Sequence, residues 1–198
     1  MGRQAAYKAR TRAALLTSAQ EVLAEIGLEA TIEDLANHAQ VSPATIYNHF
    51  ENKEVFLKEA LDQIWHESVR LAYEGKSQGE SFELMIDVCR KLLRLSPKKS
   101  LFGRVLKKTF SNSTFAIDAI RPGSEKEFKD ALQKGGLVVE DFETRLDMWS
   151  YCLAGIFEGV FVSEKMTPSE ADKALKVSLA IWNLTNKQAE KLTSRALK

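Results

Sequence analysis

The chain contains 198 residues, with 28 Lys and Arg against 27 Asp and Glu, 44% hydrophobic and 28% charged residues. These proportions are those of a soluble globular protein and exclude the disordered and low-complexity classes. The length suits one large domain, or a small domain joined to a medium one.

Two further features exclude membrane and secreted classes. The most apolar stretch, from Met148 to Val162, is too short to span a bilayer and contains a glutamate. The first residues lack the pattern of a secretory signal, and the two cysteines, Cys89 and Cys152, lie far apart. The sequence therefore predicts a cytoplasmic protein with reduced thiols.

The first residues of the chain are basic. Arg3, Lys8, Arg10 and Arg12 precede the first acidic residue, Glu21, whereas the rest of the chain has more acidic than basic residues. A short basic arm ahead of such a body is typical of contact with a polyanion. A solvated terminus is an equally good interpretation on charge alone.

Every long segment has helical rather than strand periodicity, so the sequence predicts an all-α fold with about nine helices. Capping residues, glycines and a proline at a first helical position set the boundaries. The first predicted helices run over 15–26, 32–39, 42–50 and 52–72, and a Gly- and Ser-rich break follows at 75–79. We accordingly place a small domain over 1–52, a connecting helix and linker over 53–79, and a larger helical domain over 80–198.

The larger domain has its own boundary signals. Thr167 and Glu170 form a predicted capping box, and Asp141 is a predicted N-cap. The first expected helix covers 85–95 and is ended by Pro97, and a short helix starts at 101. The next helix is interrupted by Arg-Pro-Gly-Ser at 121–124 and closed at 135–136. A helix over 141–163 follows, and a last helix starts at 168 and passes Trp182.

The segment around residue 40 has the spacing of a helix-turn-helix, whose second helix enters the major groove of DNA. A helix of about eight residues, the turn Gln40–Val41 and a short helix opened by Ser-Pro fit that motif. Val41, Ile46 and Phe50 would anchor the short helix, and its other face carries groups that suit base edges and phosphate oxygens. A purely structural hairpin would rather expose Glu, Lys and Gln. The outward residues are Pro43, Ala44, Thr45, Tyr47, Asn48 and His49.

The ordered residues Thr31 to Ala36, Val41 to Phe50 and Asn52 to Glu54, followed by Leu57, resemble the DNA-binding signature of TetR-type transcriptional repressors. The resemblance covers the chain from about Thr11 to Leu61, and beyond that it depends on helix count and length. It implies a repressor that binds a palindromic DNA operator as a homodimer. It also implies release by a small apolar or amphipathic effector held in the larger domain.

The resemblance assigns phosphate contacts to three residues. Thr31 and Ser42 lie at helix N-caps, where hydroxyls and backbone amides meet phosphates. Lys53 matches a phosphate-contacting lysine at the start of the fourth helix. One departure concerns Gln40, which stands where the family usually has glycine, so we expect a non-glycine residue in a less favourable conformation there.

The short helix carries the other DNA contacts that the resemblance implies. Positions that contact the backbone or bases are matched by Thr45, Tyr47 and His49. Positions that set sequence preference are matched by Pro43, Ala44 and Asn48. Because proline and alanine offer only apolar contacts, direct readout is expected to depend on Thr45 and Asn48.

The resemblance also implies that the last two helices pair with their copies in a four-helix dimer interface. The apolar surface of the helix from Asp141 covers more than one face, and Ala154, Gly155 and Gly159 allow close approach of another helix. A central core helix is the alternative interpretation. The interface candidates are Trp149, Gly155, Gly159, Ile181 and Trp182.

The effector cavity is expected among aromatic and soft side chains of the intermediate helices, although such a stripe also fits a core. The candidates are Trp65, Met85, Cys89, Phe102, Phe110, Tyr151 and Glu158. The last of these, a carboxylate on an otherwise apolar helix, needs a partner. That partner is either a cation of the ligand or an Arg or Lys across the dimer.

Catalytic and metal-binding motifs are absent from the sequence. His38, His49 and His66 lack the spacing of metal ligands on one helix, and the chain has no glycine-rich phosphate loop, nucleophile elbow or paired-cysteine signature. We therefore expect no enzyme activity, no cofactor and no membrane partner. Two alternatives stay open: a helical interaction or ligand-binding protein that does not bind DNA, and an all-α enzyme with an unfamiliar constellation.

Overall fold

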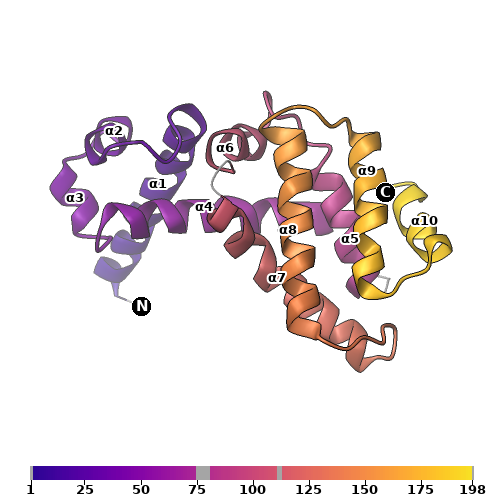
Figure 1. Cartoon of the computed structure of the whole chain (residues 1–198). Helices are drawn as coiled ribbons and strands as arrows, with labels where there is room; N and C mark the ends of the chain where they lie inside the picture. The colour runs from indigo at the N-terminus through magenta and orange to yellow at the C-terminus, as the bar shows by residue number, and fades with distance from the viewer. Residues whose placement is uncertain (1, 75–80, 111–112, 198) are drawn as a thin grey trace.

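The structure, a computed structural model, describes residues 2–74, 81–110 and 113–197. Within these ranges it contains ten α-helices, one 3₁₀ helix and no strand, which confirms the all-α prediction (Figure 1). The predicted break at 75–79 lies outside the described residues. The helices are α1 (Arg3–Glu25), α2 (Ile32–His38), α3 (Pro43–Tyr47), α4 (Lys53–Tyr73), α5 (Ser81–Leu92), α6 (Leu101–Thr109), α7 (Ser113–Gln133), α8 (Phe142–Phe161), α9 (Pro168–Ser178), η1 (Leu179–Trp182) and α10 (Asn186–Ser194).

Helices α1 to α3 and the start of α4 pack around one small apolar core. Leu35 of α2 and Ile46 of α3 are fully buried in it, and the rings of Phe50 and Phe56 stack with their centroids 4.3 Å apart. The guanidinium of Arg12 lies 4.5 Å from the centre of the Phe50 ring. These contacts hold α3 against α1 and α4, so that only one side of this short helix faces outward.

The turn between α2 and α3 has the strained conformation that the sequence predicts. Gln40 has a φ of 55°, and the Val41 and Gln40 amides donate to the carbonyls of Ala36 and Asn37. This is the left-handed end of a helix that glycine usually provides, and a side chain there costs about 1–2 kcal/mol.

Replacing Gln40 by glycine should therefore raise the free energy of unfolding by about 0.5–1 kcal/mol, because the relieved backbone strain exceeds the added entropy of the unfolded chain. Urea denaturation at a fixed protein concentration measures this. Gln40→Ala keeps the Cβ atom and should give no such gain. Equal stabilities of the two variants would contradict the assignment of strain to this turn.

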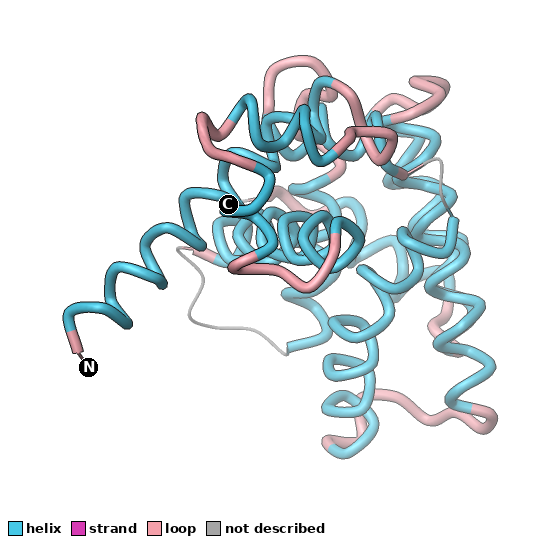
Figure 2. Tube along the Cα trace, turned by 90° about the vertical axis from the view of Figure 1, so that its left-hand side faces the viewer, coloured by secondary structure: helices cyan, strands magenta, loops and turns pink. Residues whose placement is uncertain are grey.

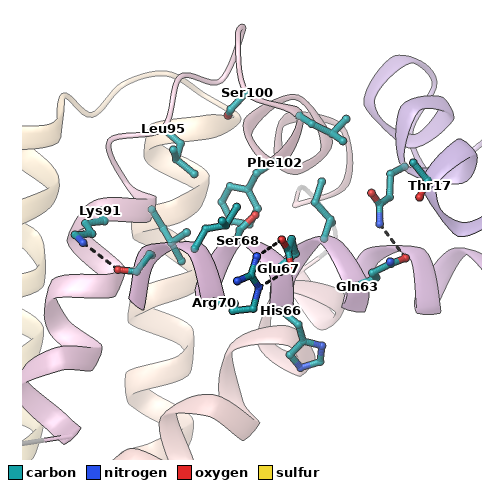
Figure 3. Close-up of a pocket in the computed structure, with 16 residues that line it drawn as sticks. Thr17, Gln63, His66, Glu67, Ser68, Arg70, Lys91, Leu95, Ser100 and Phe102 are labelled. Atoms are coloured by element: carbon teal, nitrogen blue, oxygen red, sulfur yellow. Dashed lines mark hydrogen bonds and ion pairs between the residues drawn. The ribbon is translucent and has the colours of Figure 1, made fainter. Parts of the chain in front are cut away.

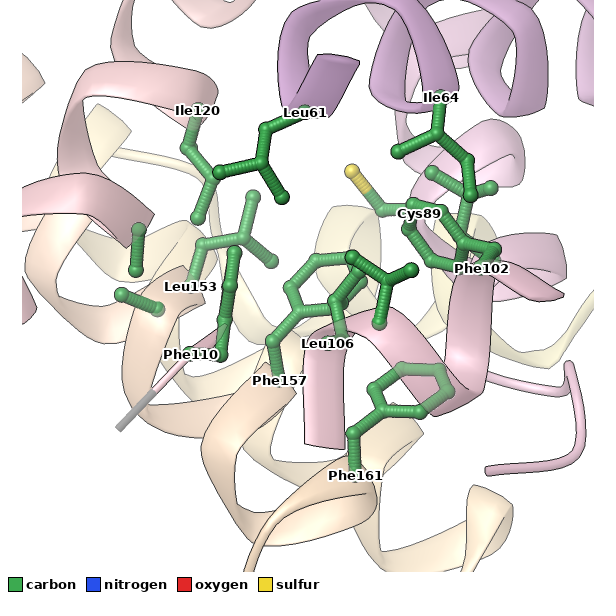
Figure 4. Packing of buried hydrophobic residues seen from close by; sticks show 14 of the residues in the cluster. Leu61, Ile64, Cys89, Phe102, Leu106, Phe110, Ile120, Leu153, Phe157 and Phe161 are labelled. Atoms are coloured by element: carbon green, nitrogen blue, oxygen red, sulfur yellow. The ribbon is translucent and has the colours of Figure 1, made fainter. Parts of the chain in front are cut away.

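Helix α4 crosses from this N-terminal group into the larger bundle of α5 to α10 (Figure 1). Helix α6 packs on α1, and α8 lies alongside α7 and α9. Much of the bundle core is aromatic: Phe102 and Phe161 meet edge to face, and Phe110 contacts Phe157 (Figure 4). Trp65 of α4 packs against Phe102, Phe110 and Phe157, with centroid distances of 5.6–6.1 Å.

The predicted interruption at 121–124 is wrong, because α7 runs through Pro122 without a break. Proline removes one backbone hydrogen bond and favours a kink. Here the helix is fixed on both sides of the proline, since Ile120 and Phe128 are buried and the Ser124 hydroxyl accepts a hydrogen bond from Trp149 Nε1 at 3.1 Å. Tertiary packing therefore overrides the local signal.

The predicted last helix is also wrong beyond Ser178. Helix α9 ends there, a 3₁₀ turn follows, and Asn183 adopts a φ of 57°. A separate helix, α10, then begins behind a capping box formed by Thr185 and Gln188. The box was detectable in the sequence, and it accounts for the additional helix.

Helix α1 begins at Arg3, about three turns before the predicted start at residue 15, whereas other boundaries differ by about a turn. Helix α3 ends at Tyr47 rather than Phe50, and α5 ends at Leu92, before the Pro97 signal. Asp141 does precede α8, but it has a φ of 54° and its side chain makes no capping hydrogen bond. The capping boxes at Thr31 and Thr167 and the cap at Asn52 are confirmed.

Candidate functional site

The outward face of α3 is the first candidate surface. The Ser42 hydroxyl accepts a hydrogen bond from the Thr45 amide at 3.3 Å and lies 3.0 Å from the Thr45 hydroxyl. Fully buried Ile46 fixes the orientation of the helix. As a result Pro43, Ala44, Tyr47 and Asn48 are exposed, as the sequence predicts.

Thr31 is the N-cap of α2, as the sequence predicts. Its hydroxyl donates to Asp34 Oδ2 at 2.6 Å and accepts from the Asp34 amide, and its own amide donates to the same carboxylate. These hydrogen bonds hold the pKa of Asp34 below its ordinary value. Both the hydroxyl and the amide of Thr31 therefore bond to Asp34 at the start of α2.

Lys53 lies beside the start of α2. Its Nζ donates to the Ala30 carbonyl at 3.2 Å and is half-buried, which leaves two of its three N–H donors for another acceptor. His49 has its Nδ1 buried without a hydrogen-bond partner. Any contact of this ring with DNA must therefore use Nε2.

The basic N-terminal residues are not a separate arm. They form the first turns of α1, which project from the body of the molecule (Figure 2). Arg3, Lys8 and Arg10 are exposed there, as is Tyr7 at 72%. The helix has neither a side-chain cap nor an acidic residue in its first turn, so positive charges lie at the positive end of the helix dipole. An external anion would offset that charge.

A cavity of about 460 Å³ lies between α4, α5, α7 and α8, and we call it the effector cavity. It brings together three of the predicted ligand residues, Trp65, Met85 and Cys89. Tyr73 also lines it, as does Glu127, which the sequence analysis missed. Burial raises the pKa of the Cys89 thiol to about 12, so this thiol is neutral. Burial also raises the pKa of Tyr73, and the nearby Glu127 adds to this effect.

The other predicted ligand residues lie elsewhere. Phe102 and Phe110 belong to the aromatic core around Trp65. Tyr151 is 59% exposed on the outer face of α8. Glu158 is half-buried on the same face, with the Ser163 hydroxyl 3.5 Å away. Neither Tyr151 nor Glu158 lines the effector cavity, because α8 turns the opposite side toward it.

Three of the predicted interface residues are core residues instead. Trp149 and Trp182 are fully buried in the protomer, where both rings pack against Phe128. A Cβ atom at Gly159 would lie 2.8 Å from the Met166 sulfur. The two tryptophans therefore cannot contact a second copy without unfolding part of the protomer, and Gly159 is covered by the Met166 side chain.

The outer face of α8 and α9, in contrast, is apolar and exposed. We define this outer face by Met148, Tyr151, Gly155 and Val177, which are all exposed. A Cβ atom at Gly155 would meet no atom within 4 Å, and Ile181 is half-buried at the end of this face. The sequence contained an indication of this face, because Met148, Tyr151 and Gly155 are three and four residues apart and therefore share one side of a helix.

The described residues were also compared with the requirements of a metal site and of a membrane-spanning helix. Within residues 2–74, 81–110 and 113–197, no group of three or more His, Cys, Asp or Glu side chains could hold a metal ion. None of the helices described there combines the length and the apolar character needed to cross a membrane.

Comparisons with known proteins agree with this architecture. Residues 15–60 match the family described as bacterial regulatory proteins, tetR family. The structure of RolR in complex with resorcinol is similar, with a TM-score of 0.72 and 18% identity over 98% of both chains. SmeT, the repressor of the Stenotrophomonas maltophilia multidrug efflux pump SmeDEF, has a TM-score of 0.63 and 16% identity over 86% of this chain and 89% of its own.

A TetR-family regulator from Streptomyces coelicolor A3 has a TM-score of 0.58 and 18% identity, over 94% of this chain and 96% of that chain. No curated protein matches the chain. The matched segment, 15–60, runs from α1 into α4 and contains the whole helix-turn-helix. The N-terminal segment of the chain thus matches the tetR family of bacterial regulatory proteins, and the fold of the whole chain is similar to that of TetR-family regulators.

Proposed function

We propose that the chain is a repressor that binds a palindromic operator as a homodimer and leaves it when a small effector fills the effector cavity. The observation that carries DNA binding is the outward face of α3, where small, hydroxyl and amide side chains are exposed and no acidic residue lies within the helix. Two such helices in a dimer would contact half-sites about one helical turn, roughly 35 Å, apart.

Phosphate contacts fall to groups around α3 that still have free donors. Ser42, Tyr47 and the unused N–H groups of Lys53 surround this helix. The exposed basic turns of α1 add a second contact, and a phosphate near Arg3 would offset the unfavourable charge at the start of that helix.

The outer face of α8 and α9 supports the homodimer. Exposed Met148, Tyr151 and Val177 form an apolar surface, and the bare backbone at Gly155 permits another helix to approach closely. A contiguous apolar surface of this kind marks an interaction site on a soluble protein. A second copy of the same face would bury it and would join two recognition helices.

The effector cavity supports a small apolar or amphipathic effector with an aromatic part. Its volume of about 460 Å³ lies within the usual range for small-molecule sites, and its lining combines Trp65 and Phe157 with the Tyr73 hydroxyl. RolR, whose fold is similar, has been solved with resorcinol, a small hydroxylated ring. Helix α4 lines the cavity and begins at Lys53, so an occupant acts on a helix shared with the DNA-binding domain.

Two substitutions distinguish a residue that contacts the DNA phosphates from a residue that recognises bases. Lys53→Ala should weaken binding to every duplex and lower the salt slope by about 1, since one phosphate contact is lost. Asn48→Ala should instead relax the preference for particular base pairs, by about 1–3 kcal/mol. Fluorescence anisotropy with genomic fragments at several salt concentrations measures both.

Lys187→Ala, on exposed α10, removes the same charge far from α3 and serves as the control. An unchanged affinity and salt slope in Lys53→Ala would refute its phosphate contact. Absence of binding by the unmodified protein to any fragment would instead favour a helical ligand-binding or interaction protein that does not use DNA.

A further inference from the structure

A second, larger cavity lies on the other side of α4 from the effector cavity. It measures about 880 Å³ and is bounded by α1, α4, α5, α6 and the α5–α6 connection (Figure 3). We call it the junction cavity, because α1 belongs to the DNA-binding part and α5 to the larger bundle. Ile64, Ser68 and Leu71 of α4 line it, whereas Trp65, Val69 and Tyr73 line the effector cavity. These two sets lie on different faces of one helix, and His66 and Leu92 line both cavities.

The junction cavity is an elongated apolar trough. Along α4 it extends from Gln63 to Ala72, a distance of about 14 Å at the helical rise per residue. Its opposite wall comes from the α5–α6 region and α6, and Leu71 on its rim is 51% exposed. The apolar lining consists of Ile64, Leu71, Ala72, Leu92, Leu95, Leu101 and Phe102. Such a surface favours a ligand with an extended apolar part.

The end of the trough at α1 is closed by amides. Gln20 is buried, and its Nε2 donates to the Ala60 carbonyl at 3.2 Å and to Gln63 Oε1 at 3.3 Å. Figure 3 shows Gln63 and Thr17 at this end, opposite Lys91. The lining residues at this end, Thr17, Gln20 and Gln63, carry no charge, so this end suits the tail of a ligand rather than an ionic group.

The other end carries an ammonium group without an acidic partner. Lys91 Nζ is half-buried and donates to the Ala72 carbonyl at 3.0 Å. No acidic side chain in the described part of the chain forms an ion pair with it, although Arg90 and Arg94, on either side of it, both pair with Asp172. The other cation of the trough, Arg70, is neutralised by Glu67 and Glu74.

An ammonium that is partly removed from water gains from a counter-ion. Lys91 has two N–H donors left, and they lie where the apolar trough ends. We propose that the junction cavity binds an elongated amphipathic carboxylate, with its acid group on Lys91 and its apolar chain along α4 toward Gln63. This inference goes beyond the proposed function, which places its effector on a different face of α4.

Decanoate is a suitable probe, with decanol and decylamine as neutral and cationic analogues of the same length. Isothermal titration of the full chain without DNA should show saturable binding of decanoate, and weaker binding of the other two. Lys91→Met keeps the length of the side chain and removes its charge, so the decanoate affinity should fall about ten- to a hundredfold. Ser68→Phe should abolish binding by filling the trough.

Matched controls come from a different face of α4 and from the other cavity. Val69→Phe fills the effector cavity, and Lys126→Met removes a lysine that lines it. Neither should change the decanoate affinity by more than about twofold. Circular dichroism confirms that each variant is folded before it is titrated.

Three results would overturn the inference: no saturable binding of decanoate, equal affinities for the three probes, or a loss of binding in Val69→Phe and Lys126→Met but not in Ser68→Phe and Lys91→Met. The last result would assign decanoate to the effector cavity. Because DNA is absent from the titration, each of these results leaves the proposed repressor function standing.

Discussion

Replacing Gly155 by glutamate should convert the proposed homodimer to a monomer without loss of helix. The residue lies on the outer face of α8 and α9, and open space surrounds its position in the protomer. The new side chain therefore fits the isolated chain, and its charge is buried without a partner only when two copies meet. That burial costs several kcal/mol, which is enough to separate the subunits. Sedimentation velocity measures the mass, and circular dichroism measures the helix content.

The same variant should lose tight operator binding, because a monomer offers one recognition helix and the gain from joining two half-sites disappears. Gln133→Glu is the control, since it adds the same charge at an exposed helical position that does not line the effector cavity. It should remain dimeric. A Gly155→Glu protein that still sediments as a dimer would place the interface on another surface.

Replacing Phe128 by alanine should lower the free energy of unfolding by about 3–5 kcal/mol. The Phe128 ring is fully buried. It stacks on Trp182 at 3.6 Å and contacts Trp149 and Phe82, each at 5.2 Å. Its removal leaves a cavity and also removes aromatic contacts. Chemical denaturation at a fixed protein concentration gives the difference, since the stability of a dimer depends on concentration.

Tyr7→Ala provides the comparison, because this aromatic residue is 72% exposed and its loss should change the stability by less than about 0.5 kcal/mol. A loss below about 1 kcal/mol for Phe128→Ala would show that Trp149 and Trp182 are not held in a packed core. Such a result would return both tryptophans to the list of interface candidates.

The local signals of the sequence predicted much of the N-terminal fold. Capping residues such as Ser42, Asn52 and Thr167 bond to amides three residues away, so they act at a range that a sequence displays directly. The turn at Gln40 is a further case: the resemblance placed Gln40 where TetR-type repressors usually have glycine, and its backbone is left-handed. Pro122 is the opposite case: its local preference was overruled by distant contacts of Ser124 and Phe128.

The candidate sites were less predictable, because periodicity groups residues on a helix face but does not say what that face meets. Trp65, Met85 and Cys89 were correctly grouped around one cavity. Tyr151 lies on the other side of α8 and is exposed. The sequence around it is as apolar as the sequence around the three cavity residues, so periodicity could not separate them. Lys91 gave no signal, since the role proposed for it depends on which side chains surround it after folding, where its Nζ bonds to the Ala72 carbonyl and no acidic side chain of the described residues pairs with it.

The central claim is that two copies of this chain present paired α3 helices to one DNA site. Selection of bound duplexes from a random library by the purified full-length protein tests it most directly. We predict enrichment of a palindrome whose half-sites lie about one helical turn apart, roughly 35 Å, and no enrichment of that palindrome by Gly155→Glu. Recovery of unselected sequences, or of single half-sites bound equally well by both proteins, would contradict the claim.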